Sequence, residues 1–482
     1  MALTQLKPTI VKIMVPVSAI QSVGKSRALR RGLLHTAAWL AMLLTVSLLW
    51  GQGCSPPAAP PQPADITYTS DDHTQKVISL LAGESKSNPY KEFDRHFSGL
   101  VVPPSLFALN PFVLGLSTDS PVPTILLLEA HWVKSYGEAG WLFELERSGL
   151  FSKDKLVPAV AAAFTGSQAG TSDRREEALM AVPTSIRGNV LFFRRDLLTR
   201  YGLAPPRHWD ELEAICRTIL PREKHLKYGL LMHARGFIDD FYPIFWGFGG
   251  RVMEGDQFVL AQPQNQAAFL AALKEIQSLQ RTILPAARDM KQFQSEGAIQ
   301  QSFFQGETLF MINWNTRLKD LSAWLSQNEG KGAGSLTDLN QAGVTPIPSQ
   351  AGQPRRYTNL DSLGWAVNIT PATGWNALQV VKGVKQFLQL VASERFQLQA
   401  AETWGEVPSL RGALEKVKNR EVLEAYNNAF AMADLVLQVR PPRQRVNEVL
   451  GKYVEEALYG RQTPEAALQG ALQELERLTV VR

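Results

Sequence analysis

The sequence has few residues of the kinds that bind metals or form disulfides. Only two cysteines, Cys54 and Cys216, occur among 482 residues, and the seven histidines are scattered. No Cys-x-x-Cys pair is present, so the sequence does not indicate a metal site. WGFGGRV (246–252) is glycine-rich but is neither a phosphate-binding loop nor GxGxxG. The sequence as a whole shows no recognisable catalytic constellation. We therefore expect a protein with no cofactor and no enzymatic activity.

Acidic residues are absent from the first 53 positions. The chain is almost entirely apolar from Leu33 to Trp50, and Gly51 and Gly53 then lead to Cys54. A basic stretch, an apolar stretch and small residues are typical of an export signal. This one resembles a bacterial lipoprotein signal, so residues 1–53 are predicted to be removed and Cys54 to be lipidated. The alternative is an uncleaved anchor, because this apolar run is just long enough to span a bilayer. The basic residues of the leader are Lys7, Lys12, Lys25, Arg27, Arg30 and Arg31.

The leader also accounts for the basic character of the chain. The formal net charge is +5, and removal of the six leader cations leaves a body that is close to neutral, at about −1. The sequence therefore gives no support to a nucleic-acid partner. The following segment, SPPAAPPQPA (55–64), is expected to be a semi-rigid spacer that with Cys54 forms a tether at 54–64. Both interpretations of the leader place the body outside the cytoplasm, the first of them as a membrane-anchored lipoprotein.

The body of the chain, 65–482, alternates between strand-like and helical patterns. This alternation predicts an α/β fold, and the length indicates two domains. Cys216 lies on the apolar side of a predicted helix and is interpreted as a small core residue. Thr463 and Pro464 mark a well-defined helix start. Strands are predicted at 66–69, 124–130, 189–195, 309–314 and 365–369, and helices at 210–220, 266–280, 377–392 and 464–478.

One stretch, VPTSIRGNVLFFRRDLLTRYGLAPPRHWDEL (182–212), resembles the signature of the family 1 extracellular solute-binding proteins. These are the maltodextrin-binding-like receptors of ABC importers. The shared elements include a strand with an aromatic pair, a basic-Asp-Leu-Leu helix, Tyr-Gly-Leu, Pro-Pro, and Trp before Asp-Glu-Leu. His208 stands where the family usually has a capping Thr or Ser, which is expected to weaken the start of that helix. Further matching blocks lie at 123–146, 302–318, 362–369, 400–414 and 459–472.

The resemblance implies a two-lobed periplasmic-binding-protein fold of type II, with three hinge crossings near 185–190, 312–316 and 361–366. The first lobe would comprise 65–187 with 314–365, and the second 188–313 with 366–482. It also implies a monomeric receptor that traps a small-molecule solute and delivers it to an ABC permease. A carbohydrate is expected, because nine tryptophans follow Cys54 and sugar rings stack on aromatic faces. Two alternatives stay open: another solute (a polyol-glycoside, a polyamine or an anion), or a receptor that signals to a membrane sensor without transporting.

Family position also implies which residues contact the solute. Trp404 lies in ETWGEVPS, where Gly405 and Pro408 predict a loop, and Trp314 follows LFMIN at an expected crossing. We predict that these two form aromatic walls of the site, although aromatic residues of α/β proteins mostly belong to the core. The ligand-binding residues implied by the resemblance are Glu129, His131, Asp239, Asp240, Trp246, Asn313, Trp314, Asp361, Trp365, Trp404 and Glu406.

Overall fold

The computed structural model describes residues 125–166 and 177–480, except 139, 141, 147–148, 150, 234–237, 255–256, 286–289, 294, 328–333, 368–384, 386 and 437–442. These residues fall within one compact unit, Tyr68–Arg482. Within them, no helix combines the length and apolarity needed to cross a bilayer. The predicted signal, Cys54, the tether and the strand at 66–69 lie outside the described residues.

The larger sheet has four strands in the order β11–β6–β10–β7. β10 runs parallel to β7 and antiparallel to β6, and β11 is antiparallel to β6. Successive residues of a strand point to opposite faces, and both faces of this sheet are buried, which explains the unbroken apolar runs in the sequence. The bounds are β6 Asn189–Arg194, β7 Tyr228–Leu231, β10 Thr308–Trp314 and β11 Ala342–Thr345.

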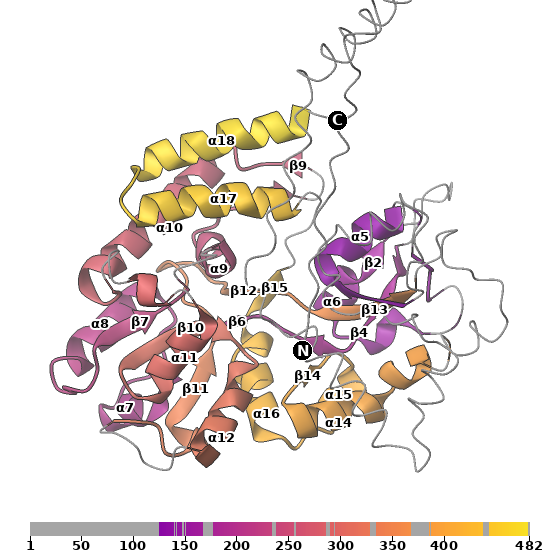
Figure 1. Ribbon diagram of the computed structural model, residues 1–482, viewed down its shortest axis with the longest axis horizontal. Coiled ribbons are helices and arrows are strands. Elements are labelled where there is room, and N and C mark those ends of the chain that lie inside the picture. Colours follow the sequence, from indigo (N-terminus) through magenta and orange to yellow (C-terminus); the bar gives the residue numbers. More distant parts are fainter. Residues whose placement is uncertain are drawn as a thin grey trace, which may run out of the picture. The chain divides into compact units, whose positions relative to one another are not determined.

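Helices cover both faces of this sheet (Figure 1). On one face α11 (Glu296–Phe304), α12 (Arg317–Gln327) and α16 (Arg420–Asn428) pack against Phe192 and its neighbours. The other face carries the buried Cys216, as the sequence predicts, together with two C-terminal helices that pack side by side against α9 and α10. The helices on that face are α7 Arg195–Arg200, α8 Trp209–Ile219, α9 Ile238–Gly247, α10 Pro263–Thr282, α17 Arg443–Leu458 and α18 Pro464–Val480.

The smaller sheet has three strands in the order β1–β13–β4, with β13 antiparallel to both neighbours. Its strands are β1 Ile125–Glu129, β4 Ala181–Pro183 and β13 Leu363–Val367. The chain continues from β4 into β5 (Ser185–Ile186), which pairs antiparallel with β14 (Val407–Pro408). The helices of this region are α5 Ala130–Glu138, α6 Pro158–Ala163, α14 Glu394–Trp404 and α15 Arg411–Leu414, and the chain is also helical at 387–391.

Short elements complete the described chain. Two hairpin-like pairs are formed by β2 (Thr165–Gly166) with β3 (Ala178–Leu179), and by β8 (Met253–Glu254) with β9 (Gln257–Phe258). Single turns of 3-10 helix lie at η3 Lys153–Lys155, η4 Met290–Phe293, η5 Leu339–Gln341 and η7 Phe430–Met432.

Segments of chain that join the two sheets lie beside one another. The segment 186–189 connects β5 to β6, and 359–362 connects β12 (Tyr357–Asn359) to β13. A further strand, β15 (Asp434–Val436), pairs in parallel with β12 and precedes α17. The backbone NH of Asp361 donates to Arg187 O at 3.0 Å, and that of Leu360 to Val436 O at 2.9 Å. The three segments therefore form one small hydrogen-bonded junction.

This arrangement differs from the division expected from the sequence. Residues 312–316 end β10, and the chain then stays in the same sheet as β11 rather than crossing to the smaller one. The segment 366–482 is divided: β13, α14 and α15 pack with the smaller sheet, whereas α17 and α18 pack on α9 and α10, which belong with the larger one. β15, and not the end of β10, is the remaining junction strand.

Candidate functional site

Polar residues collect at one edge of the larger sheet, where the parallel strands β7 and β10 end and β6 begins. His233 lies two residues beyond β7, Asn313 and Trp314 end β10, and Asn189 starts β6 opposite Trp314. In open α/β sheets the crevice outside the carboxyl ends of the strands is where ligands bind. Three of these four residues are polar, while the interiors of β6 (190–193) and β10 (309–312) are apolar, which makes this edge the candidate site.

The smaller sheet presents its own carboxyl edge to the same junction. Glu129 ends β1 opposite Leu363, and the backbone NH of Ala130 donates to Ser362 O at 3.0 Å. β5 pairs with β14 up to Ile186 opposite Val407, and Arg187 and Glu406 are the neighbouring residues in the sequence. We call this set of residues the crossover site: Glu129, Arg187, Asn189, His233, Asp240, Glu296, Asn313, Trp314, Asp361 and Glu406.

Asp240 is the buried centre of one half of the crossover site. It has no exposed surface, and its Oδ1 accepts a hydrogen bond from Asn189 Nδ2 at 2.7 Å. Its Oδ2 accepts from the backbone NH of His233 at 2.8 Å and lies 3.0 Å from His233 Nδ1. The backbone NH of Asn189 in turn donates to Asn359 Oδ1 at 2.8 Å. This network thus links the end of β7, the start of α9 and two junction segments.

His233 has its second ring nitrogen free for a further partner. The residue is 8% exposed, and Nε2 is buried without a hydrogen-bond partner among the described residues. Burial alone would lower the pKa of His233, but the negative charges of Asp240, Glu296 and Asp239 outweigh it, and the net effect is a raised pKa. A protonated His233 would present an N–H donor at Nε2 while Nδ1 donates to Asp240.

Trp314 is the centre of the other half. Its ring is 7% exposed, its Nε1 donates to Glu296 Oε1 at 2.9 Å, and the Arg187 guanidinium lies 5.2 Å from the ring centroid. Glu296 also pairs with Arg317, which donates to Asp320 Oδ2 at 2.7 Å. An aromatic ring with a cation over its face and a carboxylate at its edge is held in a fixed orientation.

The structure assembles part of the set implied by the resemblance. Asp240, Asn313, Trp314 and Asp361 lie at the junction, and strand register brings Glu129 and Glu406 next to it. Asp239 precedes Asp240 in the first turn of α9, and its negative charge helps to raise the pKa of His233.

Two of the expected tryptophans lie in the hydrophobic core instead. Trp246 is 2% exposed and stacks on Tyr242 with ring centroids 5.5 Å apart. Trp365 is fully buried and meets Phe387 edge to face at 4.9 Å. Neither presents a surface that a solute could contact in this structure.

Two further expected residues are described by their backbone position only. His131 lies in the first turn of α5, just beyond β1. Trp404 is the last residue of α14, which corrects the expectation of a loop at this point. Gly405 follows it with φ of 68°, a left-handed residue that ends the helix.

Arg187, Asn189, His233 and Glu296 were not anticipated from the sequence. Arg187 and Asn189 flank the glycine of the recognised signature, so their place between two strands was visible there. His233 lies just beyond the carboxyl end of β7, where ligands bind in open α/β sheets. A lone histidine in the sequence does not by itself predict a binding site. The role of Glu296 depends on packing of α11 beneath Trp314 and has no local signature.

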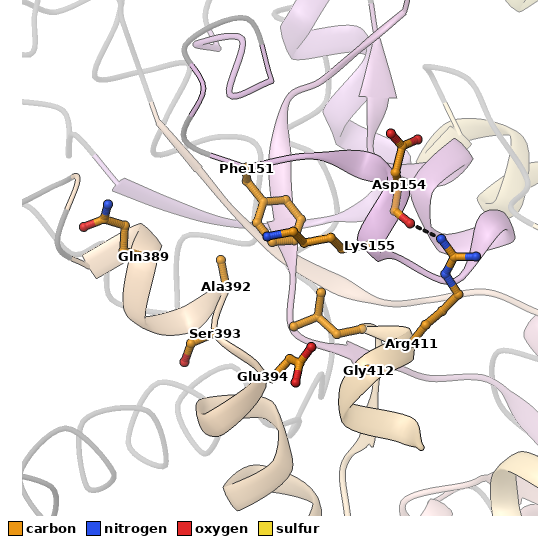
Figure 2. A pocket seen from close by; sticks show the side chains of 10 residues that line it. Phe151, Asp154, Lys155, Gln389, Ala392, Ser393, Glu394, Arg411 and Gly412 are labelled. Carbon is orange, nitrogen blue, oxygen red and sulfur yellow. Dashed lines mark hydrogen bonds between the residues drawn. The ribbon is translucent and has the colours of Figure 1, made fainter. Parts of the chain in front are cut away.

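A cavity of about 530 Å³ lies elsewhere, between η3 and the starts of α14 and α15. Figure 2 shows Arg411 reaching back to the backbone oxygen of Asp154 across it. Lys155 and Arg411 balance Asp154 and Glu394, and no residue of the crossover site lines this cavity. Among the described residues, no group of three side chains could hold a metal ion.

Comparison with known proteins identifies the class. The family model described as bacterial extracellular solute-binding protein matches residues 114–429. The chain belongs to this family. The family is extracellular, which places the protein outside the cytoplasm, and its members are binding proteins.

Solved structures of solute-binding proteins share the fold. The maltose-bound MalE3 of T. maritima is 20% identical, with 84% of this chain and 96% of that one covered and a TM-score of 0.61. The sugar-binding protein MalE of Xanthomonas citri is 15% identical, with 86% and 97% covered and a TM-score of 0.63. An Agrobacterium vitis S4 ABC transporter solute-binding protein with bound D-mannitol is 18% identical, with 86% and 96% covered and a TM-score of 0.60. The predicted two-lobed α/β periplasmic-binding-protein fold is therefore confirmed.

Proposed function

We propose that this solute-binding protein captures a carbohydrate or polyol at the crossover site and delivers it to an ABC importer. The observation that carries the proposal is the meeting of two carboxyl sheet edges, rich in carboxylates and amides, beside Trp314. Hydroxyl groups of a sugar pair with carboxylates and amides, while its C–H face stacks on an aromatic ring. The similar proteins that hold maltose and D-mannitol agree with this solute class.

The proposed mechanism needs no chemical step. A solute that touches Glu129 or Asp361 on one side and His233 or Trp314 on the other gains contacts from both sheets only when the lobes close. Its differential affinity then shifts the equilibrium toward the closed form. The junction segments at Gly188, Leu360 and Val436 would carry the bending, and a permease would recognise the closed shape of the monomer.

The solute class is tested by thermal unfolding of the protein with a panel of maltose, larger maltodextrins, D-mannitol, a polyamine and simple anions. A ligand that binds only the folded state raises Tm. We expect the largest increase with a sugar or polyol, confirmed by calorimetric titration. A Tm increase with the polyamine alone would contradict the proposal. It would indicate instead that the acidic residues of the site bind amines.

We also propose that the protein is attached to the membrane through a lipid on Cys54. The support is in the sequence: a basic and apolar leader, two small residues before the cysteine, and a proline-rich tether after it. A receptor held by a lipid and a short semi-rigid tether stays at the membrane surface, where its importer is, which raises its effective concentration there.

A further inference from the structure

Trp314 is buried without belonging to a hydrophobic core. The other buried tryptophans of the described chain each belong to one of the two buried hydrophobic clusters: Trp132, Trp209, Trp246 and Trp365. Trp314 is 7% exposed and belongs to neither cluster. Polar and charged groups therefore hide part of its ring from water. Such groups leave a ring more readily than packed aliphatic side chains do, because their polar ends regain hydration when they move.

The Arg187 guanidinium covers one face of this ring, with its central carbon 5.2 Å from the ring centroid. Glu296 holds the edge of the ring through the 2.9 Å hydrogen bond from Trp314 Nε1, so the ring is not free to turn away from the cation. A cation–π contact is favourable but modest in free energy. A sugar ring that stacks on this face must therefore displace the guanidinium, because the two cannot occupy the face together.

The backbone of Arg187 is fixed, whereas its side chain is long and flexible. The backbone NH donates to Ser362 Oγ at 3.3 Å, and the carbonyl oxygen accepts the NH of Asp361 at 3.0 Å. The next residue, Gly188, lies so close to Asn359 that a side chain does not fit there. The side chain of Arg187 can therefore move while this junction segment keeps its place.

The cation and the ring are held by different sheets. Trp314 ends β10 of the larger sheet. The backbone of Arg187 is hydrogen-bonded to Asp361 and Ser362, which lead directly into β13 of the smaller sheet. A rotation of one lobe relative to the other changes the distance between the guanidinium and the ring. Lobe movement and access to the face of Trp314 are thus coupled through Arg187.

We propose that Arg187 is a displaceable cover of the stacking face of Trp314 and thereby a specificity-determining residue of the crossover site. The proposal rests on the function proposed above for the class of solute. A pyranose has a C–H face that stacks on an aromatic ring, so it needs this face and must displace the guanidinium. An acyclic polyol has no such flat face and binds through its hydroxyl groups. The cover therefore lowers the affinity for ring sugars relative to acyclic polyols.

The first test follows the ring without any solute. In the full chain labelled with 5-fluorotryptophan, the fluorine signal of Trp314 is identified by its loss in Trp314→Phe, and its shift between H2O and D2O measures exposure. Arg187→Ala should increase this shift, and Arg187→Lys, which keeps a cation, should change it less. The matched control is Arg222→Ala, which should leave the signal unchanged, because Arg222 lies over Tyr201, at 5.6 Å from that ring centroid.

The second test is calorimetric titration of the same variants with maltose and with D-mannitol. Arg187→Ala should bind maltose about threefold to tenfold more tightly than wild type, because the cation–π contact no longer has to be broken. Its affinity for D-mannitol should change by less than about twofold, because no stacking face is needed. If Arg187→Ala does not fold, Arg187→Gln, which is shorter and uncharged, takes its place in both tests.

The outcomes distinguish this proposal from the proposed function. A folded Arg187→Ala in which the exposure of Trp314 is unchanged would overturn the cover, whichever solutes bind. Weaker binding of maltose by Arg187→Ala would also overturn it, because the arginine would then contact the solute directly. Equal gains for maltose and D-mannitol would exclude the role in specificity. If the ring becomes exposed but neither protein binds a sugar or polyol, the cover stands and the proposed solute class fails.

Discussion

Trp314 is held by a carboxylate at its edge and a cation over its face, and it is nearly buried. We expect Trp314→Ala to lower solute affinity about tenfold to a hundredfold, because one stacked aromatic ring contributes about that much to binding. Burial of the ring adds a loss of about 3–5 kcal/mol in unfolding free energy, which a partly exposed cleft wall would not show. Calorimetry and denaturant unfolding measure the two effects separately.

Trp314→Phe is the matched variant, because it keeps a ring but removes the hydrogen bond from Nε1 to Glu296. It should unfold closer to wild type and retain most of the affinity. If both variants bind the best solute as wild type does, the ring serves only the core and the crossover site must be redrawn.

The His233–Asp240 pair makes stability depend on pH. The folded-state pKa of His233 is raised above the ordinary value of 6.5, since Asp240, Glu296 and Asp239 outweigh the opposing effect of burial. Its stabilising contribution is therefore complete below pH 6.5 and is lost as the pH rises through the folded-state pKa. Urea unfolding across this range should show that decline in wild type, and His233→Gln should remove it.

His225 is the control with the opposite sign. Burial and the charge of Arg194 lower its pKa, so its contribution is present above pH 6.5 and is lost as the pH falls. His225→Gln should leave the decline above pH 6.5 intact. A decline that survives in His233→Gln would assign the effect to another group.

At the scale of elements, the junction depends on a glycine. A Cβ at Gly188 would lie 2.3 Å from Asn359 O and 2.6 Å from Thr358 Cγ2. The segment 186–189 therefore approaches the end of β12 too closely for a side chain at Gly188. Gly188→Ala should therefore lower the unfolding free energy by about 1–3 kcal/mol, or separate the two segments. Denaturant unfolding and solute titration of the same variant measure both consequences.

Gly297 provides the comparison. It lies in α11, and a Cβ there would meet nothing within 4 Å. Gly297→Ala should stabilise the protein by about 0.5–1 kcal/mol, because alanine loses less backbone entropy in a helix. Equal behaviour of the two variants would show that the junction adapts to an added methyl group.

The sequence predicted elements with strong local patterns and missed what depends on distant pairing. β6, β10, α8 and α18 were found within two residues, and Thr463 Oγ1 caps α18 by accepting the NH of Ala466 at 3.2 Å, as predicted. β15 is three half-buried residues whose role comes only from pairing with β12, about 75 positions earlier in the chain. No local pattern could reveal it as a junction strand.

The site shows the same limit. Acidic and amide residues after strands were recognised from their position in the pattern of the family that the sequence resembles. Trp365 and Trp314 look alike in sequence, each in an apolar run, yet one is fully buried against Phe387 and the other has polar partners at the junction. Only packing distinguishes a core aromatic from one at a site.

At the scale of the whole molecule, closure of two lobes on a solute is the central expectation. Small-angle scattering with and without the best solute should give a smaller radius of gyration in the bound state. A profile that does not change at saturation would describe a rigid binder, for which trapping by closure is the wrong mechanism.

Attachment to the membrane is tested at Cys54. Cys54→Ala should yield an unprocessed precursor or a protein released from the membrane fraction, while the wild-type chain should carry a diacylglycerol mass at its mature N-terminus. Normal processing without any lipid mass would contradict the lipid anchor, and the leader would then serve only as an export signal.

The packing of α17 and α18 on α9 and α10 has a consequence for how the protein is made. Leu468, Leu472 and Leu475 belong to the same buried cluster as Phe241 and Phe269, so that core lacks one wall until almost the last residues have been added. A chain threaded through a secretion channel from its N-terminus cannot complete this core while its C-terminal helices are still inside the cell. If the chain is exported unfolded from its N-terminus, this core would stay open until α17 and α18 had crossed the membrane.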